Sequence, residues 1–349
     1  RLKYLSDLHT SIMPIVKTIA IDCRFASTNS GIGRYTRELV SELIKSNECN
    51  WKLLVKSVSE TWPNGTELIH APFDHYSLSE QIRLPKLLKE SEADLLFSPH
   101  FNVPFFCPIP YVITIHDLIL HRYPNQSSAL KRFAYKLLMS RAVRKSKHII
   151  TISNFVLNDI AQTYGRNKIK NKTSVIYEGV SDNFYPRSKV EQNDEFFLYV
   201  GNAKEHKNVQ TLIDAHKQLP DDSPSLVLVC GGTESKKLKI NNRVRLISEI
   251  SDEELPALYS SAKAFVTASL YEGYCLPVTE AQACGCPVIA SNKGAIPEVA
   301  GNEAKLIEPN IEQLVEAMRN PPAPPKNFNK PEWKSTSKGT MEVLIKCIT

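Results

Sequence analysis

The sequence predicts an α/β protein built from two doubly wound parallel sheets that face a central cleft. Short apolar runs alternate with helix-like segments along both halves of the chain, and the alternation restarts near residue 195 after a polar segment. Polar residues or glycines follow the predicted strands, and doubly wound sheets bind ligands beyond these strand ends. The residues at these ends are Gly31, His100, His116, Ser153, Glu178, Gly201, Gly231, Glu272 and Ser291.

Length and composition are consistent with two domains of moderate size. The chain has 349 residues, of which 42% are hydrophobic and 23% are charged, so each half can build its own core. The formal net charge of +6 is too small for a dedicated nucleic-acid binder and fits a protein with anionic ligands or an anionic partner surface. We therefore expect no nucleic-acid partner.

Eight cysteines are spread along the chain without a CxxC pair or a His–Cys spacing typical of zinc sites. We expect free thiols, a cytoplasmic location and no metal. No signal peptide is visible, and three prolines interrupt the longest apolar tract, 103–115, so no membrane-spanning helix is expected. Residues 1–16 lack helix or strand patterning and are interpreted as a leader or tail.

The first domain opens with a predicted strand at 18–23 and a glycine-bearing loop that ends at Gly33. A helix with one apolar face is predicted over 34–45. The dinucleotide fingerprint is incomplete because Thr36 stands where a third glycine is needed, which disfavours a dehydrogenase. Further strands are predicted at 51–58, 93–98, 111–115, 148–151 and 173–177, and helices at 78–89, 127–145 and 154–164.

The second domain repeats the strand–helix alternation after the polar linker. Ser251 and Glu254 form a capping box that begins a helix. Strands are predicted at 196–200, 225–230, 244–248, 264–266, 287–290 and 304–307, with helices ending near 218 and 261 and one helix at 277–283. The expected divisions are a leader or tail at 1–16, a first domain at 17–185, a linker at 186–194, a second domain at 195–320, and a Pro-rich connector with a terminal helix at 321–349.

Two carboxylates, Glu272 and Glu280, stand with seven residues between them in the stretch 268–301. An apolar strand precedes Glu272, and a helix with Pro277 in its first turn follows it. Glu272 thus lies on a loop that leads into a helix N-terminus, where free N–H groups and the helix dipole favour an anion. Glu280 lies about one turn along the helix, on the face that can look back toward the loop. A phosphate and a polyol could be bound together here.

This stretch resembles the retaining GT-B glycosyltransferases of family 4. The family shows a Gly-Phe-Gly-Leu-Pro-like turn between two Glu residues, then Ala-Cys-Gly-x-Pro-Val and Pro-Glu-Val-x-Gly. Here the three motifs begin at Glu272, Ala283 and Pro297. Further similarities lie at Gly31–Tyr35, Thr114–Asp117, Ser153, Gly179–Val180 and Gly201–Asn208, so the resemblance runs from about residue 18 to about 310. It implies two Rossmann-like domains facing a central cleft, with a nucleotide-sugar donor bound mainly by the second.

The resemblance also implies roles for the matching residues. Glu280 would hydrogen-bond the ribose hydroxyls of the nucleotide, and Glu272 would contact the donor sugar. Lys207 would bind the diphosphate as charge develops on the leaving group. His116 would face the sugar from the first domain, so His116, Lys207 and Glu272 form the implied catalytic set. The loop residues and backbone N–H groups that complete the donor site are Gly31, Gly33, Gly201, Asn202, Gly273, Tyr274, Cys275 and Leu276.

Two residues depart from the family pattern. Asn202 stands where family members often carry Arg, and Lys204 or His206 could replace it only in part because neither offers the bidentate fork of Arg. Cys275 replaces the usual glycine of the turn and would be strained if that position needs a positive φ. The diphosphate loop otherwise resembles that of bacterial mannosyl- and rhamnosyltransferases of surface polysaccharides, which favours GDP-mannose as the donor.

The resemblance implies hexose transfer with retained anomeric configuration and without a metal or other cofactor. The acceptor would be a glycan or a lipid-linked saccharide in the synthesis of a surface polysaccharide such as lipopolysaccharide. Three alternatives stay open: the same reaction with a UDP- or dTDP-sugar, a nucleotide-sugar epimerase, and a non-catalytic nucleotide-sugar-binding protein.

A basic segment between Lys131 and Lys147 holds seven Lys or Arg and no acid. One interpretation is a core-packed helix with a solvated basic face. The other is docking on an anionic membrane surface, which would place the protein on the cytoplasmic face of a membrane beside a lipid-linked acceptor. The apolar residues interleaved with the basic ones are Leu130, Phe133, Leu137 and Leu138.

Overall fold

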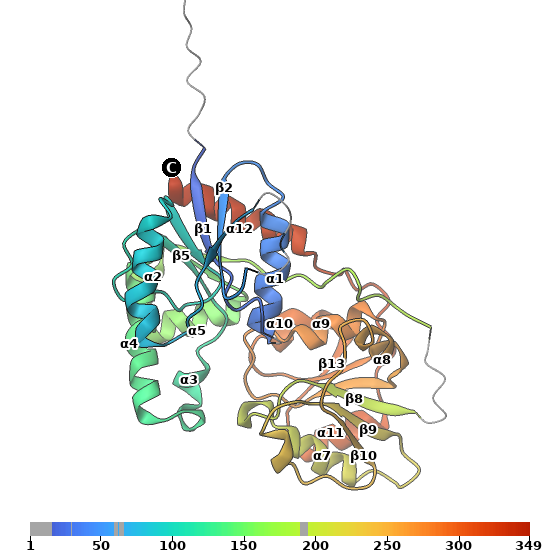
Figure 1. Ribbon diagram of the computed structural model, residues 1–349. Coiled ribbons are helices and arrows are strands. Elements are labelled where there is room, and N and C mark those ends of the chain that lie inside the picture. Colours follow the sequence, from blue (N-terminus) through green and yellow to red (C-terminus); the bar gives the residue numbers. More distant parts are fainter. Residues whose placement is uncertain (1–15, 29, 59–61, 63–65, 189–194) are drawn as a thin grey trace, which may run out of the picture.

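The computed structural model describes residues 16–28, 30–58, 62, 66–188 and 195–349 (Figure 1). Residues 1–15 of the predicted leader and most of the predicted linker lie outside the described residues. The described chain forms two α/β domains, each built on a parallel sheet, so the predicted fold class is confirmed. No described helix is both long enough and apolar enough to cross a bilayer.

The first domain holds seven described strands in the order β3-β2-β1-β4-β5-β6-β7. β1 pairs with β2 on one side and β4 on the other, so the strand order reverses there and leaves a crevice at the strand ends. The strands are β1 (Thr18–Asp22), β2 (Asn50–Val55), β3 (Glu67–His70), β4 (Leu95–Ser98), β5 (Tyr111–Ile115), β6 (His148–Thr151) and β7 (Thr173–Val175). The helices are α1 (Gly31–Leu43), α2 (Leu78–Glu90), α3 (Ile119–Arg122), α4 (Ala129–Lys145), α5 (Asn154–Tyr164) and α6 (Arg166–Ile169), with a 3-10 turn, η1 (Pro124–Gln126).

The second domain has six described strands in the order β10-β9-β8-β11-β12-β13, again with a reversal, here between β8 and β11. One face of this sheet packs on α8, α9 and α10, and the other packs on α7 and α11. The strands are β8 (Phe196–Val200), β9 (Ser225–Val229), β10 (Val244–Ile247), β11 (Ala264–Thr267), β12 (Val288–Ser291) and β13 (Ala304–Ile307). The helices are η2 (Glu205–Lys207), α7 (Val209–Lys217), η3 (Ser235–Lys237), α8 (Leu255–Ser261), α9 (Leu276–Ala283), α10 (Ile296–Ala300), η4 (Gly301–Glu303) and α11 (Ile311–Arg319).

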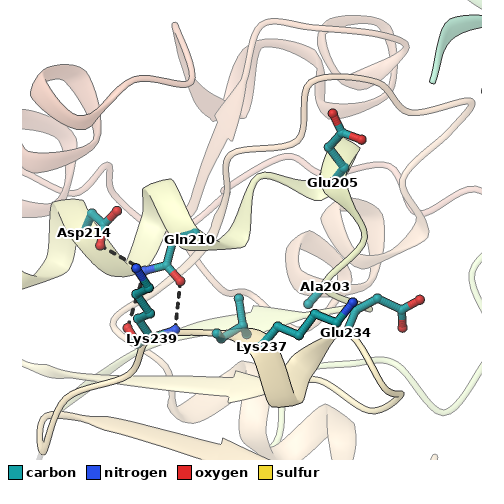
Figure 2. Close-up of a pocket in the computed structure, with 8 residues that line it drawn as sticks. Ala203, Glu205, Gln210, Asp214, Glu234, Lys237 and Lys239 are labelled. Carbon is teal, nitrogen blue, oxygen red and sulfur yellow. Dashed lines mark hydrogen bonds between the residues drawn. The ribbon is translucent and has the colours of Figure 1, made fainter. Parts of the chain in front are cut away.

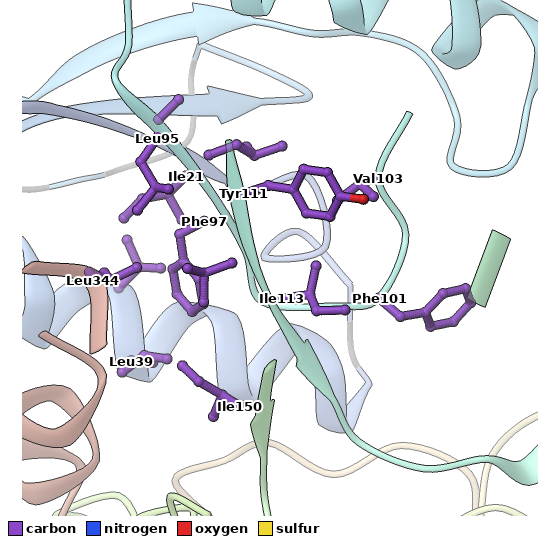
Figure 3. Packing of buried hydrophobic residues seen from close by; sticks show 14 of the residues in the cluster. Ile21, Leu39, Leu95, Phe97, Phe101, Val103, Tyr111, Ile113, Ile150 and Leu344 are labelled. Carbon is purple, nitrogen blue, oxygen red and sulfur yellow. The ribbon is translucent and has the colours of Figure 1, made fainter. Parts of the chain in front are cut away.

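The C-terminal helix, α12 (Trp333–Ile348), returns to the first domain and packs beside α1 (Figure 1). Its Leu344 joins the apolar core that β1, β4 and β5 build with Ile21, Phe97 and Ile113 (Figure 3). Near the start of α12, the N–H of Val180 donates to the carbonyl of Pro331 at 2.8 Å. The segment that leads from the first domain into the second therefore lies beside the segment that returns to the first domain.

One predicted boundary needs correction, and two elements were missed. The first helix begins at Gly31 and not at 34, because the hydroxyl of Ser30 caps it by accepting from the N–H of Gly33 at 3.1 Å. The strand β3 and the helix α11 were not predicted. β3 is a short edge strand whose four residues are all exposed or half-buried, so it lacks the apolar signal of the central strands. α11 does carry that signal, since Asn310 caps it and Leu314 and Met318 are buried on one face.

Candidate active site

The loop between β11 and α9 carries Glu272 at the C-terminal edge of the second sheet. The carboxylate of Glu272 accepts a hydrogen bond from Nζ of Lys207 at 2.6 Å, and both groups are largely buried. Burial alone would lower the pKa of Lys207, but the surrounding groups, led by the Glu272 carboxylate, together raise that pKa. Lys207 is therefore a fixed cation beside a fixed anion at this strand end.

Lys207 ends the η2 turn, directly before α7. Its backbone N–H donates to the carbonyl of Lys204 at 2.8 Å, and Asn208 follows it with a left-handed φ of 54°. Asn208 in turn accepts from the hydroxyl of Thr211 at 2.6 Å. This turn directs the ammonium of Lys207 across the sheet edge toward Glu272.

Gly273 brings the second domain into direct contact with the first. A Cβ at this position would lie 1.9 Å from the carbonyl oxygen of His116, so no residue with a side chain fits without a shift of the backbone. The carbonyl of Gly273 also accepts from the hydroxyl of Ser153 at 2.7 Å. The loop that carries Glu272 is thus held against two strand ends of the first sheet.

Both ring nitrogens of His116 are engaged inside the protein. Nε2 lies 2.8 Å from the carbonyl of Pro99, and Nδ1 lies 3.4 Å from the carboxylate of Glu178. The ring also meets the edge of Tyr35 at 4.6 Å between centroids. His116 therefore presents its backbone carbonyl, and not its ring nitrogens, toward the Glu272 loop.

Glu280 lies on α9 and is buried. One carboxylate oxygen accepts from the hydroxyl of Tyr259 at 3.2 Å, and the other pairs with Arg34, which reaches over from α1 of the first domain. The other amino group of the Arg34 guanidinium pairs with Asp252. Burial raises the pKa of Glu280, and the Arg34 guanidinium opposes that rise. A ligand that bonds both oxygens of Glu280 would have to displace Arg34.

Cys275 occupies the N-cap of α9 with a left-handed φ of 86°. A non-glycine residue in this region is strained, as expected for a position where the family pattern has glycine. Burial raises the pKa of the Cys275 thiol, and the nearby Glu272 carboxylate adds to that rise while Lys207 opposes it. The thiol is therefore a neutral neighbour of the Lys207–Glu272 pair.

Comparison with known proteins identifies the family. A model of "Glycosyltransferase Family 4" matches residues 29–184, and a model of "Glycosyl transferases group 1" matches residues 181–320. The chain is 32% identical over 266 residues to an O-antigen chain mannosyltransferase, RfbU, of Salmonella typhimurium, covering 71% of this chain and 73% of that protein. The chain belongs to glycosyltransferase family 4.

Two further comparisons agree with this assignment. The O-antigen chain mannosyltransferase B of Escherichia coli is 26% identical over 328 residues, covering 82% of this chain and 85% of that one. The crystal structure of Anabaena HepE with UDP and glucose superposes with a TM-score of 0.71 at 17% identity, covering 95% of this chain and 99% of that one. The fold of this glycosyltransferase is therefore GT-B.

The glycine loop of this glycosyltransferase lies at the start of α1. Gly31 opens the helix with open space around its α-carbon, whereas Gly33 packs tightly against the carbonyl of Thr28. In the second domain, Gly201 follows β8, and Asn202 is exposed. The Asn202 side chain accepts from the N–H of Lys204 at 3.2 Å, so it shapes its own loop.

The side chains of Tyr274 and Leu276 do not line the carboxylate site. Tyr274 is buried among first-domain core residues, and its hydroxyl donates to the carbonyl of Glu178 at 2.8 Å. Leu276 packs against the same core at the start of α9. The prediction that Tyr274 and Leu276 belong to the donor site therefore rests on their backbone N–H groups alone.

Two residues near the site were not among the predicted site residues. Asp117 follows His116, and its carboxylate is held by the N–H of Ile119 at 2.8 Å. Burial raises the pKa of Asp117, with opposing contributions from His116 and Lys207. The second residue, Arg34, could have been noticed in the sequence. It lies in the first turn of α1, where a cation is unfavourable unless an acidic partner lies elsewhere. The location of that partner, 246 residues away, could not be read from the sequence.

A hollow of about 600 Å³ adjoins the loop 201–208, and neither Lys207 nor Glu272 is among the residues that line it (Figure 2). On one side Gln210 bonds Asp214 at 2.9 Å and accepts from the N–H of Lys239 at 2.9 Å. The residues that line the hollow are Ala203, Glu205, Gln210, Asp214, Glu234, Lys237, Leu238 and Lys239.

No group of three or more His, Cys, Asp or Glu that could hold a metal occurs in the described part of the chain, and metal-independent chemistry stays a prediction.

Proposed function

We propose that this glycosyltransferase moves a mannosyl residue from GDP-mannose to a glycan or lipid-linked acceptor of a bacterial surface polysaccharide, with retention of configuration. The observation that carries the proposal is the pairing of Lys207 with Glu272 at 2.6 Å, with Glu280 further along the same loop–helix unit. Mannose is favoured because the relatives RfbU and mannosyltransferase B are both named as O-antigen chain mannosyltransferases.

The arrangement supplies a cation for a leaving diphosphate. In the free protein Glu272 neutralises Lys207, so an incoming diphosphate exchanges one anionic partner of the ammonium for another. As the bond between the sugar and the diphosphate breaks, negative charge grows on the phosphate oxygen, and a preorganised cation lowers the energy of that state. Release from Lys207 would leave a Glu272 oxygen free to accept from a hydroxyl of the donor sugar.

Retention is proposed to follow from attack by the acceptor on the face that the diphosphate leaves. The departing phosphate then takes the acceptor proton, so the step needs no base from the protein. Gly273 and His116 are in contact across the domain interface, and such closure would exclude water from the reacting bond.

The reaction is tested by acceptor-dependent release of nucleoside diphosphate. We expect GDP release from GDP-mannose in the presence of lipid-linked oligosaccharide, and little release from UDP-glucose or dTDP-rhamnose. Consumption of the donor without acceptor would instead support an epimerase. Glu272→Ala and Lys207→Ala should each lower turnover by about a hundredfold, the scale of one preorganised charge contact. Near-normal turnover in either folded variant would contradict the assignment.

We further propose that the first domain docks on an anionic membrane. The basic helix α4 packs through Tyr135, Met139, Ala142 and Val143, which leaves Leu130 79% and Phe133 68% exposed beside exposed lysines. These exposed apolar and basic side chains suit insertion at a lipid headgroup boundary.

The neighbouring elements extend this surface. The loop after β4 links α2 to α4, because the N–H of Phe105 donates to Gln81 and its carbonyl accepts from Arg141. Phe106 on that loop and Ile82 on α2 are also exposed.

Flotation with vesicles of phosphatidylglycerol and phosphatidylethanolamine tests this docking. The protein should float with the vesicles at low salt. A Phe133→Ser, Lys136→Ser variant should stay at the bottom, and failure of the parent protein to float would remove the idea.

A further inference from the structure

Tyr76 is held in a conformation that tyrosine rarely adopts. Its φ is +63°, in the left-handed region, yet 54% of the residue is exposed. A non-glycine residue in this region costs about 1–3 kcal/mol and persists only where the surroundings fix it. More than half of the residue stays exposed, so burial returns only part of this cost, and the fold alone does not account for tyrosine at this position.

Two contacts of its own fix Tyr76 in place, and a helix cap follows it. Its backbone N–H donates to Oε2 of Glu80 at 2.7 Å. Its hydroxyl lies 3.4 Å from both ring nitrogens of His100. The next residue, Ser77, caps α2 by accepting from the N–H of Glu80 at 3.1 Å. The backbone and the hydroxyl are thus anchored while the residue stays half exposed.

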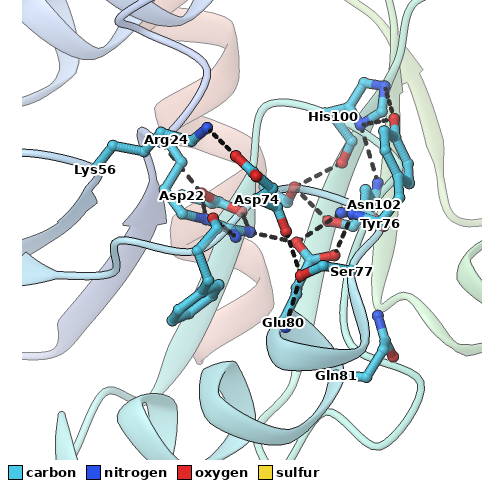
Figure 4. Close-up of polar contacts among 12 residues, drawn as sticks. Asp22, Arg24, Lys56, Asp74, Tyr76, Ser77, Glu80, Gln81, His100 and Asn102 are labelled. Carbon is cyan, nitrogen blue, oxygen red and sulfur yellow. Dashed lines mark hydrogen bonds and ion pairs between the residues drawn. The ribbon is translucent and has the colours of Figure 1, made fainter.

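A buried polar network, shown in Figure 4, supports these contacts. Arg24 is fully buried and pairs with Asp22 and with Glu80, each at 2.6 Å. The side-chain amide of Asn102 donates to Glu80 at 2.8 Å. Buried charges are costly to desolvate, and this network satisfies them with ion pairs and hydrogen bonds. It joins the loop after β1, the start of α2 and the loop after β4.

A row of rings connects Tyr76 to the active site. The ring of His100 lies 6.4 Å from that of His116, centroid to centroid, and 6.1 Å from that of Tyr76. Phe25 lies 4.9 Å from His100 on one side and stacks on His75 at 3.6 Å on the other. His116 contacts Gly273, so the row leads outward from the Glu272 loop along the edge of the first sheet.

His75 adds an unused polar atom at the outer end of this row. Its Nε2 is buried inside the protein and has no hydrogen-bond partner among the described residues. Burial holds the pKa of His75 at about 4, so its ring is neutral at pH 7. Because this nitrogen is buried, His75 supports the row through its stack on Phe25 and offers no atom to a ligand.

We propose that Tyr76 forms a platform for a pyranose ring of the acceptor glycan. The ring of Tyr76 packs against the apolar C–H face of the sugar. This inference rests on the proposed function, because it deepens the acceptor side of that reaction. The next exposed residues along the chain, Leu78 and Ile82 on α2, would lie toward the lipid part of a lipid-linked acceptor.

Saturation-transfer NMR of the ligand-free protein with methyl α-D-mannopyranoside and α-1,3-mannobiose tests the platform directly. We expect transfer to the ring C–H protons of both probes with the parent protein and with Tyr76→Phe. Tyr76→Gly should weaken binding about tenfold, the scale of a lost aromatic contact. Glycine adopts a positive φ without strain, so this variant should fold at least as well as the parent protein. Tyr185→Ala removes a half-exposed tyrosine that contacts Arg187 and should change nothing.

The outcomes separate this proposal from the proposed function. No saturation transfer with the parent protein, or equal transfer with Tyr76→Gly, overturns the platform. Thermal stabilisation by GDP-mannose reports on the donor site and should be the same in Tyr76→Gly as in the parent protein. If GDP-mannose and other nucleotide sugars fail to stabilise the protein while Tyr76→Gly still loses glycoside binding, the proposed donor is wrong and the platform stands.

Discussion

At the scale of single residues, the turn before α9 places two requirements on one position. Cys275 must adopt a left-handed φ of 86°, and its thiol fills a buried space beside Glu272 and Lys207. Glycine would meet the first requirement and leave the second unmet. The residue therefore combines local strain with packing at the centre of the site.

A pair of substitutions separates strain from packing at this position. Cys275→Ala loses the thiol and keeps the strain, whereas Cys275→Gly loses both. We expect Cys275→Gly to be more stable than Cys275→Ala by about 1 kcal/mol, the usual cost of a left-handed non-glycine residue. Urea denaturation of the two variants measures the difference, and equal stability would show that the turn relaxes around alanine.

Single site residues could be predicted from the sequence where a motif fixes their local neighbours. Glu272 and Glu280 could be selected from the strand–loop–helix pattern around them, and Lys207 from the resemblance of its loop to the family. The engagement of both His116 nitrogens could not, because Pro99 and Glu178 meet it only through the packing of separate loops.

At the scale of elements, α10 of the second domain caps α5 of the first. The carboxylate of Glu298 accepts from the N–H groups of Asn154 and Phe155 at 2.7 and 3.1 Å, and from the hydroxyl of Tyr177. Carboxylates stabilise helix N-termini through these N–H groups and the helix dipole. The α5 cap thus doubles as a contact between the domains.

This cap should depend on pH. Burial raises the pKa of Glu298, but the hydrogen bonds from Tyr177, Asn154 and Phe155 outweigh it and hold the pKa below the usual 4.5. A lowered pKa in the folded state gives stability that is present above about pH 4.5 and is lost as the pH falls through the folded value. We expect Glu298→Gln to lower Tm at pH 7 and to differ less from the parent protein as the pH drops below 4.5.

The matched control is Glu312→Gln, which removes an exposed first-turn glutamate of α11. Its effect on Tm should be smaller at pH 7. A Tm difference for Glu298→Gln that stays constant from pH 7 to pH 4 would contradict the ion-dependent cap.

At the scale of the whole molecule, the two domains are joined by polar contacts that are far apart in sequence. Arg34 pairs with Glu280 and Asp252 across the cleft. The hydroxyl of Tyr271 accepts from the N–H of Leu118 and donates to Asp159. The alternation of strands and helices predicts each domain, because local periodicity encodes it. The cross-domain pairings and the return of α12 to the first domain have no local signal and needed the structure.

The Arg34 contacts predict a change of overall shape. Arg34→Met removes both ion pairs and leaves Glu280 buried without its cationic partner, which is unfavourable. We expect a larger radius of gyration for this variant by small-angle X-ray scattering, and no change for Lys45→Met, which removes only an exposed pair with Glu42. An unchanged radius of gyration in Arg34→Met would show that the other contacts alone keep the domains together.

The central claim is that Lys207, Glu272 and Glu280 bind a nucleotide sugar with GDP-mannose preferred. Thermal unfolding with GDP-mannose, UDP-glucose and dTDP-rhamnose tests it most directly, because a ligand at a hundred times its Kd stabilises the folded state by about 2.7 kcal/mol. We predict the largest rise in Tm with GDP-mannose, and its loss in Glu280→Gln and Lys207→Met. No rise with any of the three donors, or the same rise in both variants, would contradict the account.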